Sequence, residues 1–322
     1  MEEVLEFYSA GYDDLEKLGA NDNTADVEVV VGKYCGMLSS TLSLMKEEET
    51  EEKMVQWLDN ISKMICQARR VPLHGERFSE TLCDLVRTSG GLDLVMARLS
   101  TDNMHLKYSI AKVLLQVLAT TDNKDYVVER GLEEVVAITR DFTSNKKKRD
   151  LDQCRLATGL LENLFDHTEE TCGKLIELGG LLTLVAECKS KDPETLRHCA
   201  SALANAAIFG GCENQEKMME CHVPQWLFTL LFNPDITIKA RLGNKRDQHH
   251  AIISIQNSLN MLKKKTCPNP PLVLGLPGPG HTGRQQGHRG GHTEDGQLQA
   301  GPAHPRQAQP SRLLGLRLPG QE

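Results

Sequence analysis

The stretch KLIELGGLLTLVAEC at 174–188 joins one apolar helical turn to a second apolar segment through a pair of glycines. The same arrangement of apolar residues, a turn residue and a further apolar segment returns elsewhere in the chain. The other copies are LVRTSGGLDLVMARL at 85–99, VVERGLEEVVAI at 127–138 and KMMECHVPQWLFTLL at 217–231.

The turn positions of the four copies are Gly91, Gly131, Gly180 and Pro224, which lie 40, 49 and 44 residues apart. We expect each to end one helix and start the next, because glycine reaches left-handed backbone angles and proline fits a helix start. This period is typical of armadillo and HEAT arrays. A single copy cannot bury its apolar face, so copies must stack. The sequence therefore predicts an all-α, armadillo/HEAT-type superhelical solenoid.

Composition agrees with helix-on-helix packing. Aromatic residues make up only 4% of the chain, and ten cysteines are scattered through it without a C-x-x-C pair. We expect these cysteines to be buried, reduced thiols of a cytoplasmic protein. No apolar run is long enough to span a membrane, and the acidic N-terminus does not resemble a signal peptide. No Ser-His-Asp, Cys-His or paired-carboxylate arrangement stands out, so no catalytic residue is assigned.

Charge divides the chain into three parts. Residues 1–50 carry twelve Asp or Glu against three Lys or Arg, whereas 240–322 carry four against eleven. We expect an acidic, partly flexible helical region at 1–52, about four repeats at 53–239, and a disordered tail at 240–322. The repeats form no basic stripe, which argues against nucleic-acid binding.

The tail is rich in Pro, Gly, Gln, His and Arg and has no apolar period, which is typical of disorder. Its histidines show no recurring ligand spacing, so no metal site is predicted. An alternative interpretation is that the tail combines retained non-coding sequence with a shifted reading frame. Shifted by one base, LPGPGHTGRQQGHRG at 276–290 can encode the helical string CLALAILVANKDIEA.

Apolar periodicity predicts helices almost everywhere before residue 240. The best amphipathic segment is KMVQWLDNISKMICQAR at 53–69, whose apolar stripe is expected to be core. Further helices are predicted at 4–18 and 27–45, and the long third helices of the repeats at 105–119, 150–165 and 194–208.

Three segments carry a family resemblance: RTSGGLDLVM, PQWLFTLLF, and the long segment from FDHTEETCGK to LRHCASALANAAIFGG. They resemble the armadillo region of the sterile-alpha-and-TIR-motif NAD hydrolases of axon degeneration and innate immunity. The likeness covers roughly 54–239. In that family the armadillo solenoid is autoinhibitory and senses nucleotides: NAD keeps the assembly off and nicotinamide mononucleotide turns it on.

The resemblance further implies that SAM domains make the family protein a homo-oligomer and that a TIR domain cleaves NAD. Neither domain is recognised in this sequence. We therefore expect the chain as it stands not to be an enzyme, with TIR and SAM domains as its partners and NAD or nicotinamide mononucleotide as allosteric ligands rather than catalytic cofactors.

Six positions correspond to the family's nucleotide site. Two match the family, Gln116 and Leu118. Four depart from it: Arg69 replaces a stacking Trp, Lys124 a phosphate-reading Arg, and Asn163 and Asp166 a His and a Lys. A further part of the family's site lies in a later loop without a counterpart here. The exchange of Lys for Asp at 166 is expected to be the most damaging, because it puts negative charge where a phosphate would lie.

An alternative function is a stand-alone scaffold that binds extended peptides or partner helices in its concave groove. Asn163 and Asn205 fit the armadillo pattern in which a third-helix Asn bonds the backbone of such a peptide. Gln116 and Leu118 are also ordinary third-helix residues. Arg197 and His198 are expected to bond neighbouring repeats or, alternatively, the family's TIR domain.

Overall fold

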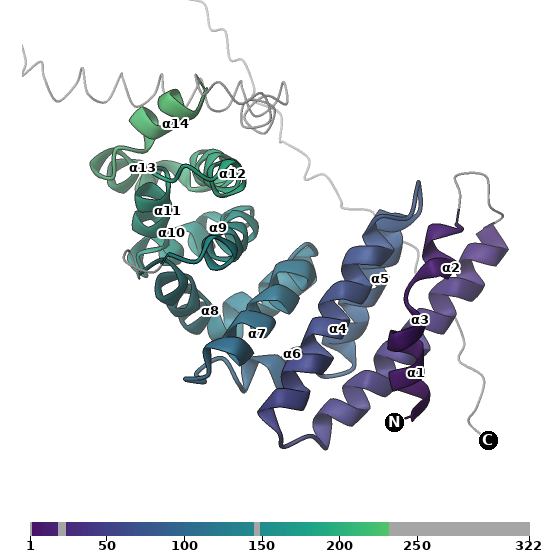
Figure 1. Cartoon of the computed structure of the whole chain (residues 1–322). Helices are drawn as coiled ribbons and strands as arrows, with labels where there is room; N and C mark the ends of the chain where they lie inside the picture. Colours follow the sequence, from purple (N-terminus) through teal and green to yellow (C-terminus); the bar gives the residue numbers. More distant parts are fainter. Residues whose placement is uncertain (1, 19–23, 145–148, 232–322) are drawn as a thin grey trace, which may run out of the picture. The chain divides into compact units, whose positions relative to one another are not determined.

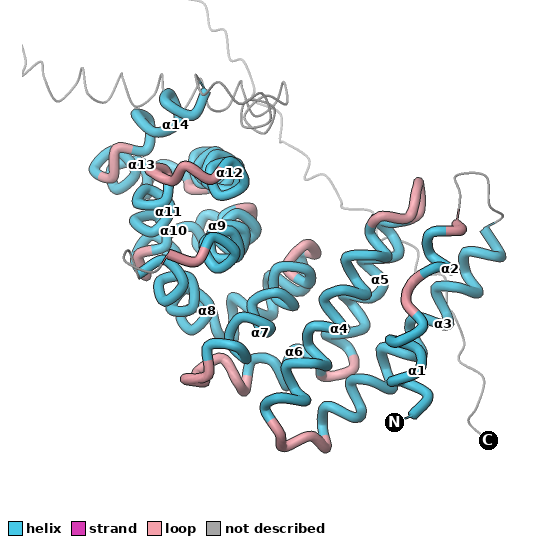
Figure 2. Tube along the Cα trace, viewed as in Figure 1, coloured by secondary structure: helices cyan, strands magenta, loops and turns pink. Residues whose placement is uncertain are grey.

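The structure is a computed structural model that describes residues 2–18, 24–144 and 149–231, and all regular structure within these ranges is helical (Figures 1 and 2). The predicted third helices are confirmed. The expectations for the tail, disorder or a shifted frame, lie outside the described residues. The helices are α1 Glu2–Ala10, α2 Asp13–Glu16, α3 Thr24–Lys46, α4 Glu51–Arg69, α5 Gly75–Thr88, α6 Gly91–Met96, α7 Met104–Val117, α8 Thr121–Ser144, α9 Leu151–Phe165, α10 Glu169–Glu177, α11 Gly180–Glu187, α12 Pro193–Phe209, α13 Gly211–Glu220 and α14 Val223–Leu231.

The helices group into repeats that stack in chain order. One repeat comprises α5, α6 and α7, the next α8 and α9, and the third α10, α11 and α12, with α13 and α14 following. The long third helices pack on one another in the sequence α4, α7, α9 and α12. This repeat-on-repeat packing confirms the predicted armadillo-type array.

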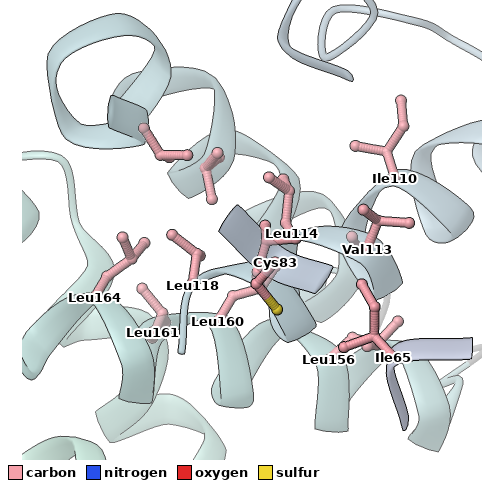
Figure 3. Packing of buried hydrophobic residues seen from close by; sticks show 14 of the residues in the cluster. Ile65, Cys83, Ile110, Val113, Leu114, Leu118, Leu156, Leu160, Leu161 and Leu164 are labelled. Atoms are coloured by element: carbon pink, nitrogen blue, oxygen red, sulfur yellow. The ribbon is translucent and has the colours of Figure 1, made fainter. Parts of the chain in front are cut away.

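Leucines of successive third helices fill the space between repeats. Leu114 lies on α7 and Leu118 directly follows that helix, whereas Leu160 and Leu164 lie on α9. All four are fully buried. Figure 3 shows these side chains gathered between the helices. Because each leucine removes most of its apolar surface from water only when the next repeat is in place, stacking supplies the stability that no single repeat has.

The acidic N-terminal region packs into the same apolar core. Tyr34 of α3 is fully buried, and its ring makes edge contacts with Phe7 of α1 at 5.2 Å and Phe78 of α5 at 5.6 Å between ring centres. The Tyr34 hydroxyl donates a hydrogen bond to the Asp14 carboxylate. The regions on the two sides of the predicted boundary near residue 52 therefore share one apolar core.

The turn residues lie between helices as expected, but the left-handed backbone angles differ from the expectation. The left-handed angles fall one residue earlier than predicted, at Gly90 with φ 75° and at Gly179 with φ 88°. In the second copy no left-handed residue occurs; Gly131 has the non-helical angle φ −170° and, as expected, separates two helices that meet at a kink within the range of α8. In the fourth copy His222 takes the left-handed angle, with φ 59°. Pro224 begins its helix as expected, at the second position of α14.

Gly91 is required by close approach. A Cβ added there would lie 2.8 Å from the backbone oxygen of Val86 and 2.7 Å from Leu42 of α3. Gly91→Ala is therefore expected to lower the free energy of unfolding by about 1–3 kcal/mol, measured by urea denaturation. Gly36→Ala is the matched control, because nothing lies within 4 Å of its added Cβ. Since alanine favours helix, Gly36→Ala should raise stability by up to about 1 kcal/mol; equal signs for the two variants would contradict the prediction.

Candidate functional site

The six candidate residues lie around the C-terminal end of α7. Arg69 ends α4, Gln116 and Leu118 lie at the end of α7, and Lys124 lies in the first turn of α8. Asn163 and Asp166 lie at the end of α9. Contacts between these helices bring the positions together, although they span almost one hundred residues of sequence.

Arg69 and Asn163 both bond to the last turn of α7, from opposite sides. Arg69 Nη2 donates to the backbone oxygen of Gln116 at 3.3 Å, and its Nε donates to the Ser79 hydroxyl at 3.4 Å. Asn163 Nδ2 donates to the backbone oxygen of Leu115 at 3.2 Å. Both acceptors are carbonyls of the last turn of α7, where intrahelical partners run out; the Gln116 oxygen also accepts from Ala119 N at 3.4 Å.

Lys124 and Asp166 form an ion pair. Lys124 Nζ lies 2.8 Å from the Asp166 carboxylate and also donates to the Asp166 backbone oxygen at 2.6 Å. The lysine side chain is only 7% exposed, whereas that of the aspartate is 50% exposed. The Asp166 carboxylate therefore neutralises the Lys124 cation at the start of α8.

Leu118 and Gln116 have different surroundings. Leu118 is fully buried among the leucines of α7 and α9 (Figure 3), which is the role of an ordinary third-helix residue. Gln116 is half-buried and lines a surface hollow described below. Of these two residues, Gln116 lines the hollow and Leu118 does not.

The third-helix asparagines bond between repeats. Asn163 reaches α7 as described, and Asn205 Nδ2 of α12 donates to the backbone oxygen of Glu162 in α9 at 3.2 Å. His198 Nδ1 lies 2.5 Å from the Glu162 carboxylate. The amide groups expected to hold a peptide backbone are used instead to link helices, and the inter-repeat interpretation of His198 is confirmed.

A hollow of about 500 Å³ lies between α4, α7 and α9, and sequence reasoning missed it. Its lining includes Leu115 and Gln116 of α7 and Leu156 of α9. Lys63 of α4 and Arg70, which directly follows α4, also line it. In the sequence these residues are separated by helical turns and belong to different repeats. No local pattern marks them as one surface.

Eight cysteines whose side chains the structure describes are free thiols; five are buried as expected, whereas Cys35, Cys66 and Cys221 are only half-buried. Burial raises the pKa of Cys83 to about 12, that of Cys172 to about 12 and that of Cys154 to about 11. At neutral pH these thiols are protonated and poor nucleophiles, so they contribute packing. Within residues 2–18, 24–144 and 149–231 no cluster of three or more His, Cys, Asp or Glu is arranged to hold a metal ion, and no helix has the length and apolar character of a membrane span.

No protein-family model matches the sequence. The chain is 40% identical over 247 residues to the NAD(+) hydrolase sarm1 of Drosophila melanogaster, covering 74% of this chain and 18% of that protein. It is 34% identical over 215 residues to the NAD(+) hydrolase SARM1 of Danio rerio, covering 66% and 29%. The NAD(+) hydrolase tir-1 of Caenorhabditis elegans is 24% identical over 211 residues, covering 64% and 21%. The chain thus spans less than a third of the length of these relatives.

Solved structures support the fold. A designed armadillo repeat protein in complex with the peptide (KR)4 superposes with a TM-score of 0.54 at 16% identity, covering 79% of this chain and 98% of that one. A computationally designed armadillo repeat protein for modular peptide recognition superposes at 0.51 and 16% identity, covering 74% and 97%. At this identity the likeness concerns the fold alone.

The predicted resemblance is therefore confirmed by sequence and by fold. The similarity covers about 70% of the chain at 34–40% identity in the first two relatives. The fold that the described residues adopt is the repeat array that the resemblance implied. The chain belongs to the family of the SARM1 NAD(+) hydrolases, and its described residues form an armadillo array.

Proposed function

We propose that this chain is the regulatory armadillo part of a SARM1-type NAD(+) hydrolase. In this proposal catalysis belongs to a TIR domain of the family protein, and SAM domains hold several copies together. The array restrains the TIR domains in the cytoplasm and responds to NAD and nicotinamide mononucleotide. The observation that carries the proposal is the convergence of the candidate nucleotide residues, from four helices, around the end of α7.

The mechanism is a population shift. NAD stabilises an inhibited arrangement only if it binds that arrangement more tightly than the active one. A cluster that joins the ends of α4, α7 and α9 is suited to this role, because a ligand bound there contacts three consecutive helices of the stack. A change in the stacking of these repeats then changes the affinity for the ligand, and binding in turn changes the stacking.

The Lys124–Asp166 ion pair sets the affinity in this proposal. A phosphate that approaches Lys124 Nζ competes with a carboxylate already 2.8 Å away and is repelled by it. We therefore expect Asp166→Asn to tighten the binding of NAD and nicotinamide mononucleotide by about five- to tenfold, because half-exposed charge pairs contribute on the order of 1 kcal/mol.

The test is a thermal-shift titration of the whole chain, because a ligand that binds the native state raises its melting temperature. Asp152→Asn is the matched control: it makes the same charge change at the opposite end of α9, where the side chain is 66% exposed. The proposal expects protection of the wild type by nucleotide and stronger protection of Asp166→Asn alone. Absence of protection in both, or the same gain in both variants, would refute nucleotide sensing at this cluster.

A further inference from the structure

The hollow between α4, α7 and α9 has a net positive lining. Lys63, Arg70 and Lys112 face one carboxylate, that of Asp59. Asp59 is already bound by Lys112 Nζ at 2.9 Å and by the Ser109 hydroxyl at 2.6 Å. Asp59 thus neutralises Lys112 and leaves the charges of the other two cations in place.

Lys63 and Arg70 have no carboxylate partner among the described residues. The Lys63 ammonium lies 5.5 Å from the centre of the Tyr12 ring, a contact with an uncharged group. Two other cations of the third helices do meet acids: Arg155 bonds Asp192, and Lys107 bonds Asp141. The two cations at the hollow are therefore available to an anionic partner.

Two side-chain amides add directional bonding groups. Gln67 of α4 and Gln116 of α7 both line the hollow. Within the described ranges neither side-chain amide makes a hydrogen bond, in contrast to Asn163 and Asn205, which link helices. Each free amide offers donors and an acceptor, the pair of groups that a peptide backbone requires.

The spacing suits an extended chain. Packed helices lie about 8–10 Å apart, so the axes of α4 and α9, on either side of α7, lie roughly 20 Å apart. An extended peptide advances about 3.3 Å per residue and covers this span with about six residues. Alternate side chains point the same way, so every second residue can face the hollow. Its apolar floor, Leu115 and Leu156, fits the aliphatic parts of such side chains.

We propose that this hollow is the binding site for an extended acidic peptide segment of a partner protein. Gln67 and Gln116 bond the backbone of the peptide, and Lys63 and Arg70 bind its carboxylates. The sign of the charge distinguishes this site from that of the designed armadillo protein whose bound peptide is (KR)4. This inference goes beyond nucleotide sensing and does not depend on it.

The test uses two fluorescein-labelled octapeptides of alternating sequence, (EA)4 and (KA)4, and follows fluorescence anisotropy with the whole chain at low ionic strength. We expect (EA)4 to bind, (KA)4 not to bind, and added salt to weaken the complex, because exposed charges are screened. No binding of (EA)4, or equal binding of both peptides, would overturn the proposal.

Charge-reversal variants locate the site. Lys63→Glu is expected to weaken (EA)4 binding at least tenfold, and Gln67→Ala several-fold. Arg140→Glu is the matched control, since Arg140 is an exposed helical cation on α8 outside the hollow. Because Lys63 is also exposed, its reversal should lower the melting temperature only slightly, through loss of the Tyr12 contact and repulsion from Asp59. Equal losses for Lys63→Glu and Arg140→Glu would show that only net charge matters and would overturn the assignment.

A competition experiment tests whether the hollow binds a peptide or only small anions. Inorganic phosphate is titrated against bound (EA)4. Displacement by inorganic phosphate at concentrations comparable to that of the peptide would mean that the hollow takes small anions, and the peptide proposal would fail. Retention of the peptide supports it. Because thermal protection by NAD is read separately with Asp166→Asn, failure of one proposal is distinguishable from failure of the other.

Discussion

Replacing Leu160 by alanine is expected to lower the free energy of unfolding by about 2–5 kcal/mol. Leu160 lies on α9, is fully buried, and packs in the leucine layer between α7 and α9 (Figure 3). Truncation removes its buried methyl groups and leaves a cavity that the flanking helices fill only in part. Since stacking between repeats supplies the stability of the array, a cavity at this interface weakens both neighbours.

The measurement is urea denaturation followed by circular dichroism, which reports loss of helix. Leu182→Ala on α11 is the control, because that leucine is 61% exposed and its truncation should change stability by less than about 0.5 kcal/mol. An equal effect of the two substitutions would contradict the packing role assigned to the layer. A transition that splits into two steps in Leu160→Ala alone would locate the weakened interface at α9.

Replacing Asp192 by alanine is expected to cost about 2–3 kcal/mol. Its carboxylate accepts bonds from Arg155 Nη2 at 2.6 Å and Nε at 3.0 Å, which join α12 to α9. It also caps α12 by accepting from Thr195 N and Oγ1, each at 2.8 Å. The Asp192 side chain is 5% exposed and that of Arg155 35%. We therefore expect less than the full cost of breaking a wholly buried pair, with the loss of the helix cap added.

Asp152→Ala is the control for this pair. Asp152 contacts the same arginine, through Nη1 at 3.0 Å, but its side chain is 66% exposed. Exposed ion pairs contribute little, so this variant should lose less than about 1 kcal/mol in urea denaturation. Equal losses for the two aspartates would show that burial and capping are not what makes Asp192 important.

The contribution of the Asp192 carboxylate to stability is expected to be lost in acid. Hydrogen bonds from Arg155, assisted by those from Thr195, hold the pKa of the Asp192 carboxyl well below its usual value of 3.8. Because the folded-state pKa is depressed, the stabilisation is fully present above about pH 4 and is lost as the pH falls towards the folded-state value. The difference in unfolding free energy between wild type and Asp192→Asn should therefore shrink below pH 4. A difference that stays constant from pH 5 to pH 2 would contradict this linkage.

The sequence by itself determined the repeat, the class of fold and the family. The recurrence of an apolar cassette every 40 to 49 residues leaves few ways to bury the apolar faces, and stacked helices are the solution that the structure shows. The third helices were predictable within a few residues because their apolar periodicity is sustained over 14–17 residues. The strings HTEETC and LRHCASALANAAIFGG were specific enough to indicate the family.

Backbone details at the turns required the tertiary structure. Both Gly90 and Gly131 lie between two helices, but Gly90, one position before the predicted turn, takes the left-handed angle whereas Gly131 has φ −170°. Gly91 is needed because Leu42 and Val86 approach it closely. Leu42 comes from another helix, and no local pattern shows such an approach.

The geometry of the candidate sites depends almost entirely on contacts between repeats. Positions 69, 116, 124, 163 and 166 could be named from the resemblance, but only the packing of four helix ends pairs Lys124 with Asp166. Only the same packing shows that Asn163 is used between helices. The basic hollow likewise combines residues of α4, α7 and α9. Helical periodicity assigns each residue to a face of its own helix, whereas charge pairing and cavities arise where faces of different helices meet.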